Sequence, residues 1–549
     1  MEELNLKADR YPRWRIHIQL DEPSGPKDRT ADPLDHEILL AQGVLKDIEQ
    51  RRNLLLDQLA RLDDKRLTVQ GVLSAVRRIP LEILGDIFTE VLPFVLNHEA
   101  RNELLNLVLV CKRWREACLL TKRLWSSITI KACWCQGRDS ASITWVHKHE
   151  EISYKKMVAW LGRSGTIPKV VRYIATELYC PCGDGDHRCH TTHPALIQLM
   201  NEGPPIAHFT LCISSTRCCR TWMNSMADAP ASSPWITLKS FSLSFIENSA
   251  FPWDDFEGHR SMFALLPAVQ VFRLYLPDHE DAFLSQVTAE ETSLHLQSGF
   301  MRRLTEFSIR WDWGGPSLFH ALRDCASLVT LTIDLNYGEL RWNAILLDGM
   351  MPLELPNLRR FALRRAGADI LNLLQTPLLE HLDMEFNVDG TESDGVSRKI
   401  RDFLHRSNIV NTLQTLRICD LVRTSAYTHI TLPNLTSLRH LVLDCNTFGY
   451  IIKSLERNRD DEALPPFLPK LEHLELHNLE RGFNLDAELA FLDAKFGGVP
   501  CLITVSRVDD PVVVESDLQN RLRIPNRGLG YYLRCIPFQE YERHKIWDY

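Results

Sequence analysis

Residues 379–387 read LEHLDMEFN, with apolar side chains at the first, fourth and sixth places. Side chains two apart in a strand lie on the same face, so Leu382 and Met384 are expected to point into a core. The polar residues between and beside them, His381, Asp383 and Glu385, are expected to point away from it. The stretch therefore predicts a short strand that is buried on one face.

This L-x-x-L-x-L pattern occurs ten times between residues 201 and 500, at intervals of 21 to 35 residues. The copies begin at Ile206, Leu238, Val269, Leu304, Leu328, Leu358, Leu379, Leu413, Leu438 and Leu471. Residues between the copies have helical spacing, as in SRKIRDFLHRS at 397–407. One strand and one helix cannot bury their apolar faces alone, so we expect the units to stack into an α/β solenoid with a continuous core.

The repeats resemble the leucine-rich repeat, in which an asparagine follows the strand. Asn336, Asn387 and Asn446 stand at that place, whereas Ala366 and Leu421 occupy it in two other copies. The resemblance, with its uneven intervals, implies an irregular leucine-rich-repeat horseshoe over residues 201–500. Its exposed strand positions are the candidates for binding a target protein: Arg310, Arg360, Arg364, His381, Asp383, Glu385, Arg417, His440, Asp444, Glu475 and His477.

A second set of motifs lies in residues 77–128. IPLEILGDIF at 79–88 has a proline suited to a first helical turn and apolar residues at helical spacing; ELLNLVLV (103–110), VCKRW (110–114) and LW (124–125) follow. In this order the motifs resemble the F-box of fungal type, an all-α three-helix module that docks on the Skp-type adaptor of cullin-based ubiquitin ligases. The resemblance assigns adaptor binding and its support to Ile79, Pro80, Ile83, Leu84, Ile87, Phe88, Val110, Cys111, Trp114, Leu124 and Trp125. The alternative, a core that serves these helices alone, is disfavoured because so small a unit cannot bury all its apolar residues.

The regions outside these two modules give weaker predictions. Residues 1–33 are polar and turn-rich and are expected to be a disordered arm. Residues 34–76 predict a long helix with a heptad seam from Leu45 to Val76, interrupted by Arg52 and Arg66. Packing within the protein and a homodimeric coiled coil both remain open for this helix. Residues 129–200 are expected to link the modules, and 501–549 form a C-terminal tail that the sequence does not place.

A Cys/His-rich stretch, CPCGDGDHRCHTTH at 180–193, raises the question of a zinc site. Cys180, Cys182, Cys189 and His193 are the candidate ligands, but their spacing is not that of a structural zinc site. An inserted loop is the favoured interpretation, and no cofactor or metal is expected.

The composition and the motifs limit which classes of function are expected. The formal charge of −8 argues against nucleic-acid or membrane partners, and the acidic N-terminus and odd number of cysteines, 15, favour a reduced cytoplasmic or nuclear protein. No common catalytic motif is present, so the chain is not expected to be an enzyme. The F-box resemblance implies the substrate-recruiting subunit of a Skp–cullin–F-box ligase. An interaction scaffold and a zinc-dependent protein are the alternatives.

Overall fold

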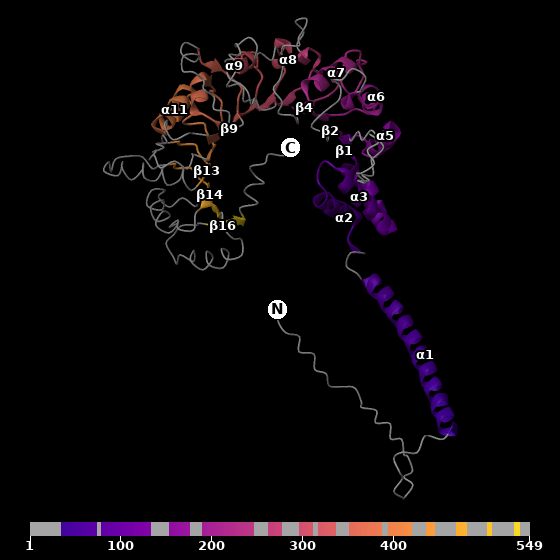
Figure 1. Ribbon diagram of the computed structural model, residues 1–549. Helices are drawn as coiled ribbons and strands as arrows, with labels where there is room; N and C mark the ends of the chain where they lie inside the picture. The colour runs from indigo at the N-terminus through magenta and orange to yellow at the C-terminus, as the bar shows by residue number, and fades with distance from the viewer. Residues whose placement is uncertain are drawn as a thin grey trace, which may run out of the picture. The chain divides into compact units, whose positions relative to one another are not determined.

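The structure is a computed structural model in which residues 35–73, 78–132, 153–175, 189–245, 262–276, 296–310, 317–335, 351–386, 393–419, 435–444, 468–479, 502–507 and 532–537 are described (Figure 1). The chain divides into two compact units, Met1–Pro80 and Leu81–Tyr549. Each unit is considered by itself.

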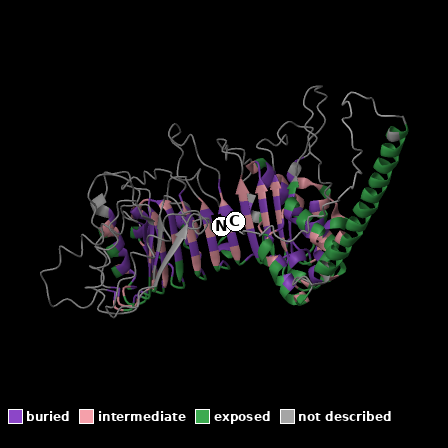
Figure 2. Ribbon diagram, turned by 90° about the horizontal axis from the view of Figure 1, so that it is seen from below, coloured by how far each residue is buried: buried purple, intermediate pink, exposed green. Residues whose placement is uncertain are grey.

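The first unit contains one long helix, α1 (Asp35–Leu73), of 39 residues. Its leucine, isoleucine and valine side chains are exposed from Ile38 to Val69, and the ribbon of this helix is coloured as exposed over nearly its whole length in Figure 2. A single helix in water gains little stability from its own hydrogen bonds, because most helical stability in proteins comes from packing an apolar face. In the described part of the chain, no helix is long and apolar enough to span a membrane.

The second unit begins with three helices and a 3-10 turn. Their bounds are α2 (Leu81–Val91), α3 (His98–Val110), α4 (Lys112–Leu120) and η2 (Lys122–Trp125). Helices α2 and α3 both pack on α4. The Asn97 side chain accepts a hydrogen bond from the backbone N–H of Ala100 and so caps α3 at its first turn.

A parallel sheet follows, and its fourteen strands within the described residues are neighbours in chain order. The strands are β1 (Ser127–Ala132), β2 (Val170–Ala175), β3 (His208–Ile213), β4 (Ser240–Phe245), β5 (Val271–Tyr275), β6 (Glu306–Arg310), β7 (Thr330–Asp334), β9 (Arg360–Ala366), β11 (His381–Phe386), β12 (Thr415–Cys419), β13 (His440–Asp444), β14 (His473–Leu479), β15 (Leu502–Arg507) and β16 (Tyr532–Pro537). The order runs from β1 to β16 without closing. This is a solenoid-like α/β arrangement.

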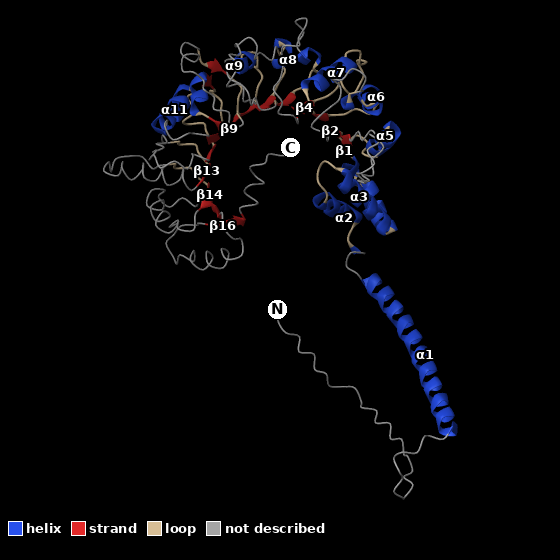
Figure 3. Ribbon diagram, viewed as in Figure 1, coloured by secondary structure: helices blue, strands red, loops and turns tan. Residues whose placement is uncertain are grey.

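Helical segments connect successive strands on one side of the sheet, as Figure 3 shows. They are α5 (Tyr154–Gly162), η4 (His190–Thr192), α6 (Pro194–Glu202), α7 (Thr216–Met226), η6 (Met262–Leu265), α8 (Ser298–Met301), α9 (Ser317–Leu322), η7 (Ala368–Leu373) and α11 (Ser393–Arg406). A separate pair, β8 (Leu353–Glu354) and β10 (Leu374–Gln375), is also parallel. Helix α7 shows why these segments fold as they do: the Ser215 hydroxyl caps it, and its apolar side, including Trp222 and Met223, is buried against the sheet.

Backbone hydrogen bonds set the register from one repeat to the next. The Glu380 carbonyl accepts from the N–H groups of Gln414 and Thr415 at 2.8 and 3.0 Å, and the Gln414 carbonyl accepts from Arg439 and His440 at 2.9 and 3.0 Å. The residue before each strand therefore places the next strand, whatever the length of the helical segment between them.

All ten strands predicted from the L-x-x-L-x-L copies are present, from β3 to β14. The sheet also extends beyond the expected solenoid, because β1 and β2 lie within residues 127–175 and β15 and β16 within 502–537. In the sheet, Ser127 pairs with Val170, and Val170 pairs with His208. Trp125 and Pro168 stand two residues before Ser127 and Val170, at the place where the other copies have their first apolar residue. Pro168 breaks the leucine pattern, although Val171 and Tyr173 are buried as the later positions require.

The helical module covers the open edge of the sheet at β1. The Thr129 N–H donates to the Leu96 carbonyl at 2.8 Å, and the Ser127 hydroxyl donates to the Phe94 carbonyl at 2.8 Å. The Trp160 indole N–H donates to the Ser127 carbonyl at 3.1 Å. The segment between α2 and α3 and the Trp160 indole of α5 thus satisfy an N–H and a carbonyl group that an edge strand would otherwise leave unpaired.

Stacked phenylalanines run through the core at one position of consecutive strands. The ring centroids of Phe209, Phe241, Phe272 and Phe307 are 5.9 to 6.1 Å apart from strand to strand, with nearly parallel planes. Phe272 also meets Phe300 edge-on at 5.2 Å. One ring therefore contacts two neighbouring repeats and a helical segment.

We expect Phe272→Ala to lower the free energy of unfolding by about 3–5 kcal/mol, because truncation leaves a cavity between two repeats. The control is Val271→Ala on the same strand, where the side chain is half-exposed and we expect a loss below about 1 kcal/mol. Urea denaturation followed by circular dichroism measures both. Equal losses would show that the ring stack does not hold the repeats together.

Candidate interaction surfaces

Helix α2 has apolar side chains on two sides. Leu84 and Phe88 are buried against the other helices of the module. Ile83, Ile87 and Val91 are 50%, 41% and 70% exposed, and their spacing of four residues places them in one row along the helix. The sequence stripe therefore splits into a packing side and an exposed apolar row.

Gly85 lets α2 approach the end of α4. A Cβ atom on this residue would lie 2.0 Å from the Thr121 Oγ1 atom, which donates a hydrogen bond to the Ala117 carbonyl at 2.8 Å. The approach is too close for any other residue type without rearrangement. Sequence reasoning did not find this contact, although a glycine inside an amphipathic helix is a recognised sign of close packing.

The next predicted residues lie around α4. Trp114 is half-buried and its ring meets Phe88 at a centroid distance of 5.1 Å, so it links α4 to α2. Val110 and Cys111 are exposed at the junction of α3 and α4. Ile79 is half-buried and Pro80 is exposed, and both lie at the end of the first unit.

Leu124 and Trp125, which the resemblance assigns to adaptor binding and its support, are buried, with only 4% and 1% of their areas exposed. The Trp125 indole N–H donates to the Cys118 carbonyl at 2.7 Å, and its ring lies 4.7 Å from that of Trp160. The Arg163 guanidinium stacks over the ring at 4.4 Å. Both residues act by packing, because they are buried where η2 leads into the first strand of the solenoid, β1.

Large exposed apolar side chains concentrate in this module. Among the described residues of the second unit, nine of fourteen such side chains lie between residues 83 and 120. The nine are Ile83, Ile87, Val91, Phe94, Leu105, Leu109, Val110, Leu119 and Leu120. Exposed apolar patches of this kind are typical of interaction sites.

We expect Gly85→Ala to destabilise the helical module by about 1–3 kcal/mol, because the added methyl group displaces Thr121. Thr121→Ala removes the offending oxygen, so the double variant should recover part of this loss. A double-mutant cycle on thermal unfolding measures the coupling. Strictly additive effects would contradict the contact.

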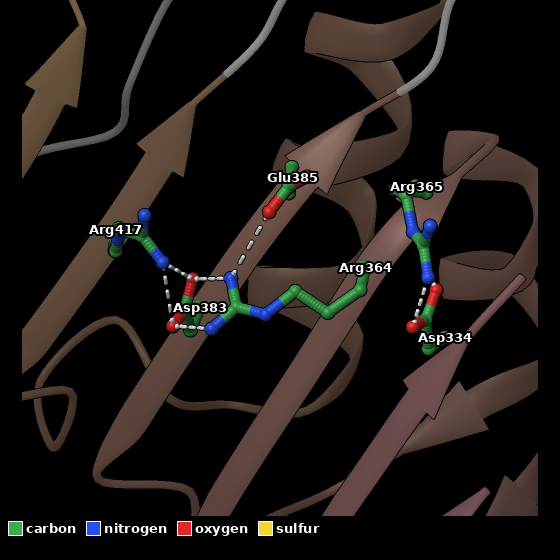
Figure 4. A network of polar contacts seen from close by, with 6 residues as sticks. All are labelled: Asp334, Arg364, Arg365, Asp383, Glu385 and Arg417. Carbon is green, nitrogen blue, oxygen red and sulfur yellow. Dashed lines mark hydrogen bonds and ion pairs between the residues drawn. The ribbon is translucent and has the colours of Figure 1, made fainter. Parts of the chain in front are cut away.

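A second surface consists of charged side chains on the outward face of β7, β9, β11 and β12 (Figure 4). Arg364 binds both carboxylate oxygens of Asp383, one at 2.6 Å, and lies 3.8 Å from Glu385. Arg417 approaches both Asp383 oxygens at 3.3 Å from the other side. Asp383 is therefore shared by two arginines on neighbouring strands.

Arg365 binds a carboxylate on β7, on the opposite side of β9 from Asp383. Its φ of +48° is unusual for a residue with a side chain, and it accompanies a register shift between β9 and β11. The guanidinium binds both oxygens of Asp334 on β7, with Nε 2.8 Å from Oδ1. Adjacent arginines in β9 thus reach carboxylates on two different strands, a role for Arg365 that the repeat pattern did not indicate.

Histidines and one carboxylate form a further group on β13 and β14. His440 and His477 lie 2.8 and 3.0 Å from the two Glu475 oxygens, and the His440 and His473 rings are 5.6 Å apart. Burial alone would raise the pKa of Glu475, but the hydrogen bonds and charges of the two imidazoles outweigh it and hold that pKa below its ordinary value. Burial and the nearby Arg360 lower the pKa of His381.

Several predicted target-binding residues are less accessible than the repeat pattern implied. Arg364, His477 and Asp444 are buried, at 8%, 3% and 2% exposure, whereas Arg360 is exposed and Arg310 and His381 are half-exposed. Contacts among charged neighbours cover these polar groups, since outward strand positions on adjacent repeats are close enough to pair. The face presents a network of ion pairs with few free charges.

We expect Asp383→Asn to lower the free energy of unfolding by about 2–4 kcal/mol, because it leaves two nearly buried arginines facing each other. Glu380→Gln is the matched control, since its partner Arg359 is half-exposed and the loss should stay below about 1 kcal/mol. Urea denaturation at pH 7 compares them. An equal effect of both changes would refute the special role of Asp383.

The candidate zinc ligands are only partly within the described residues, because Cys180 and Cys182 lie outside them. Cys189 is buried with its sulfur 2.8 Å from the Thr191 hydroxyl. The His193 Nδ1 atom accepts from the Ala195 N–H and caps α6, and burial lowers the pKa of His193. Both side chains therefore have structural roles, and the described residues contain no group of three or more potential ligands.

Comparison with known families bears on the helical module. Residues 76–131 match the F-box-like family model. No curated protein matches the chain. The F-box-like domain covers α2, α3, α4, η2 and nearly all of β1, and it suggests an F-box adaptor role in Skp–cullin–F-box ubiquitin ligases. F-box domains bind Skp-type adaptors within cullin complexes and are typically non-catalytic.

Proposed function

We propose that this chain is the substrate-recruiting subunit of a Skp–cullin–F-box ubiquitin ligase. The observation that carries the proposal is the row of exposed apolar side chains on α2 within the F-box-like domain. Each exposed methylene that a partner covers contributes roughly 0.8 kcal/mol, so a groove that accepts this row gains substantial affinity.

The adaptor-binding face has two kinds of residue in this proposal. Ile83, Ile87 and Val110 are exposed and would contact the adaptor directly, together with Val91. Leu84, Phe88 and Trp125 are buried and would act by holding α2 in place. A charge at Leu84 would disrupt the module's own core, so it cannot test docking.

The solenoid would supply target recognition, because its sheet presents side chains from many strands on one extended face. Outward residues of β3 to β7 include the small hydroxyl-bearing Thr210, Ser242, Ser308 and Thr332 beside the Arg273–Glu306 ion pair, whereas β9 to β14 carry the contacts around Asp383 and Glu475. A target would meet ion pairs whose geometry is already fixed. In this role the chain forms no bond itself and contributes proximity between target and conjugating enzyme, in the cytoplasm or nucleus.

The decisive experiment uses Ile83→Asp combined with Ile87→Asp. We expect the dissociation constant for a purified Skp-type adaptor to rise at least about 100-fold, because two charges would be buried without partners. Isothermal titration calorimetry measures binding, and circular dichroism checks that the fold is retained.

The control variant is Ile236→Asp, which changes an isoleucine of similar exposure, 42%, in the solenoid. It should leave adaptor binding unchanged. Undiminished binding by the α2 double variant would refute the docking face. Recovery of the adaptor from cells without a cullin would favour the alternative, an interaction scaffold that does not direct ubiquitin transfer.

A further inference from the structure

Helix α1 carries a row of exposed side chains at alternating steps of three and four, which we call the seam. Its members are Leu45, Ile48, Arg52, Leu55, Leu59, Leu62, Arg66 and Val69. The six apolar members are 56–64% exposed. A heptad row of this kind is the geometry by which one helix packs along another, so the seam is built for a second helix.

We propose that two copies of this chain pair through α1 as an antiparallel coiled coil. In the alignment that matches the seam to itself, Leu55 lies level with Leu59 of the second copy, and Leu45 lies level with Val69. Every apolar layer then contains side chains from both helices. The proposal does not depend on adaptor binding by the F-box-like domain.

The two seam arginines decide the direction. In a parallel, in-register pair, equivalent seam positions meet, so Arg52 would face Arg52 and Arg66 would face Arg66. In the antiparallel pair, Arg52 lies level with Leu62 of the second copy, and Arg66 lies level with its Ile48. Antiparallel pairing therefore replaces two layers of facing arginines by layers in which each arginine meets an apolar side chain, along which its aliphatic stem can pack.

The position of Leu56 agrees with this direction. Leu56 is 52% exposed and lies beside the seam. In the antiparallel alignment it meets Leu56 of the second copy near the two-fold axis, whereas a parallel pair would place it against Arg51. Arg51 is engaged within its own helix, with the guanidinium 2.9 Å from Asp47. An exposed leucine at this place is thus explained by one direction only.

The area available is near what a specific interface needs. At about 30 Å² per methylene-sized group, each half-exposed leucine, isoleucine or valine of the seam can remove about 75 Å² from water. The six apolar side chains of the seam on each helix together reach about 900 Å². Leu56 and the aliphatic stems of the arginines bring the total close to the roughly 1,200 Å² at which specific interfaces begin.

The first test measures the mass of the full-length chain by analytical ultracentrifugation at micromolar concentration. We expect a dimer of twice 63.3 kDa. Leu55→Lys combined with Leu59→Lys should raise the dimer dissociation constant at least about 100-fold, because both charges fall in the central layers. Leu54→Lys combined with Leu67→Lys is the matched control, since both leucines are 61% exposed on α1 but lie off the seam. A monomeric wild-type chain, or equal weakening by the control, would overturn the proposal.

The second test determines the direction. Leu56→Cys should give a disulfide-linked dimer on mild oxidation, because Leu56 meets its equivalent near the two-fold axis of the antiparallel pair. Leu45→Cys is the matched control, since it faces its equivalent in a parallel pair but lies 24 residues from it along the axis of the antiparallel pair, about 36 Å at 1.5 Å per residue. Non-reducing electrophoresis compares both variants with the wild-type chain. Crosslinking of Leu45→Cys, or no crosslinking of Leu56→Cys, would overturn the antiparallel arrangement.

Discussion

A sheet built from successive repeats begins with a strand that has a neighbour on one side only, and the second unit depends on how that edge is closed. At the free side of β1, the Thr129 N–H donates to the Leu96 carbonyl, and the Ser127 hydroxyl forms hydrogen bonds with the segment between α2 and α3. Trp125 links the helical module to the sheet, because it is the last residue of η2 and also stands at the first apolar position of the first repeat. The F-box-like domain is therefore also the N-terminal cap that a solenoid requires. The constraint explains why residues after Leu81 form one compact unit.

The ion pairs on the outward face follow from the parallel register. Each strand places its side chains level with those of its neighbours, so Arg364, Asp383 and Arg417 meet although 19 and 34 residues separate Asp383 from its partners in the chain. Removing polar groups from water is unfavourable unless each gains a partner, and the shared carboxylate meets this requirement for two arginines. The unusual backbone angle at Arg365 is held in the same way by Asp334.

Much of the fold could be predicted because period-2 burial is a local property of sequence. Each of the ten L-x-x-L-x-L copies forms its strand, whereas β2, β15 and β16 escaped prediction because Pro168, Pro500 and Gly530 stand in the place of the first leucine. The helical module could be recognised from IPLEILGDIF, VCKRW and LW. The division of its residues into exposed and packed sets could not be predicted, because the apolar residues on the two sides of α2 form a single stripe in the sequence. The ion pairs among charged residues could not be predicted for a similar reason. Sequence spacing shows which side chains share a face of the sheet, but it does not show which of them touch across strands.

The carbonyl of the residue before a strand accepts hydrogen bonds from two N–H groups of the next repeat, and this contact determines where the sequence can change in length. Each strand is positioned by its predecessor's turn, so the segment that returns along the helical side is free to change in length without disturbing the ladder. Intervals of 21 and 35 residues coexist in one sheet for this reason. Insertions and deletions on the helical side become a low-cost source of diversity, while the outward face of the sheet keeps its spacing.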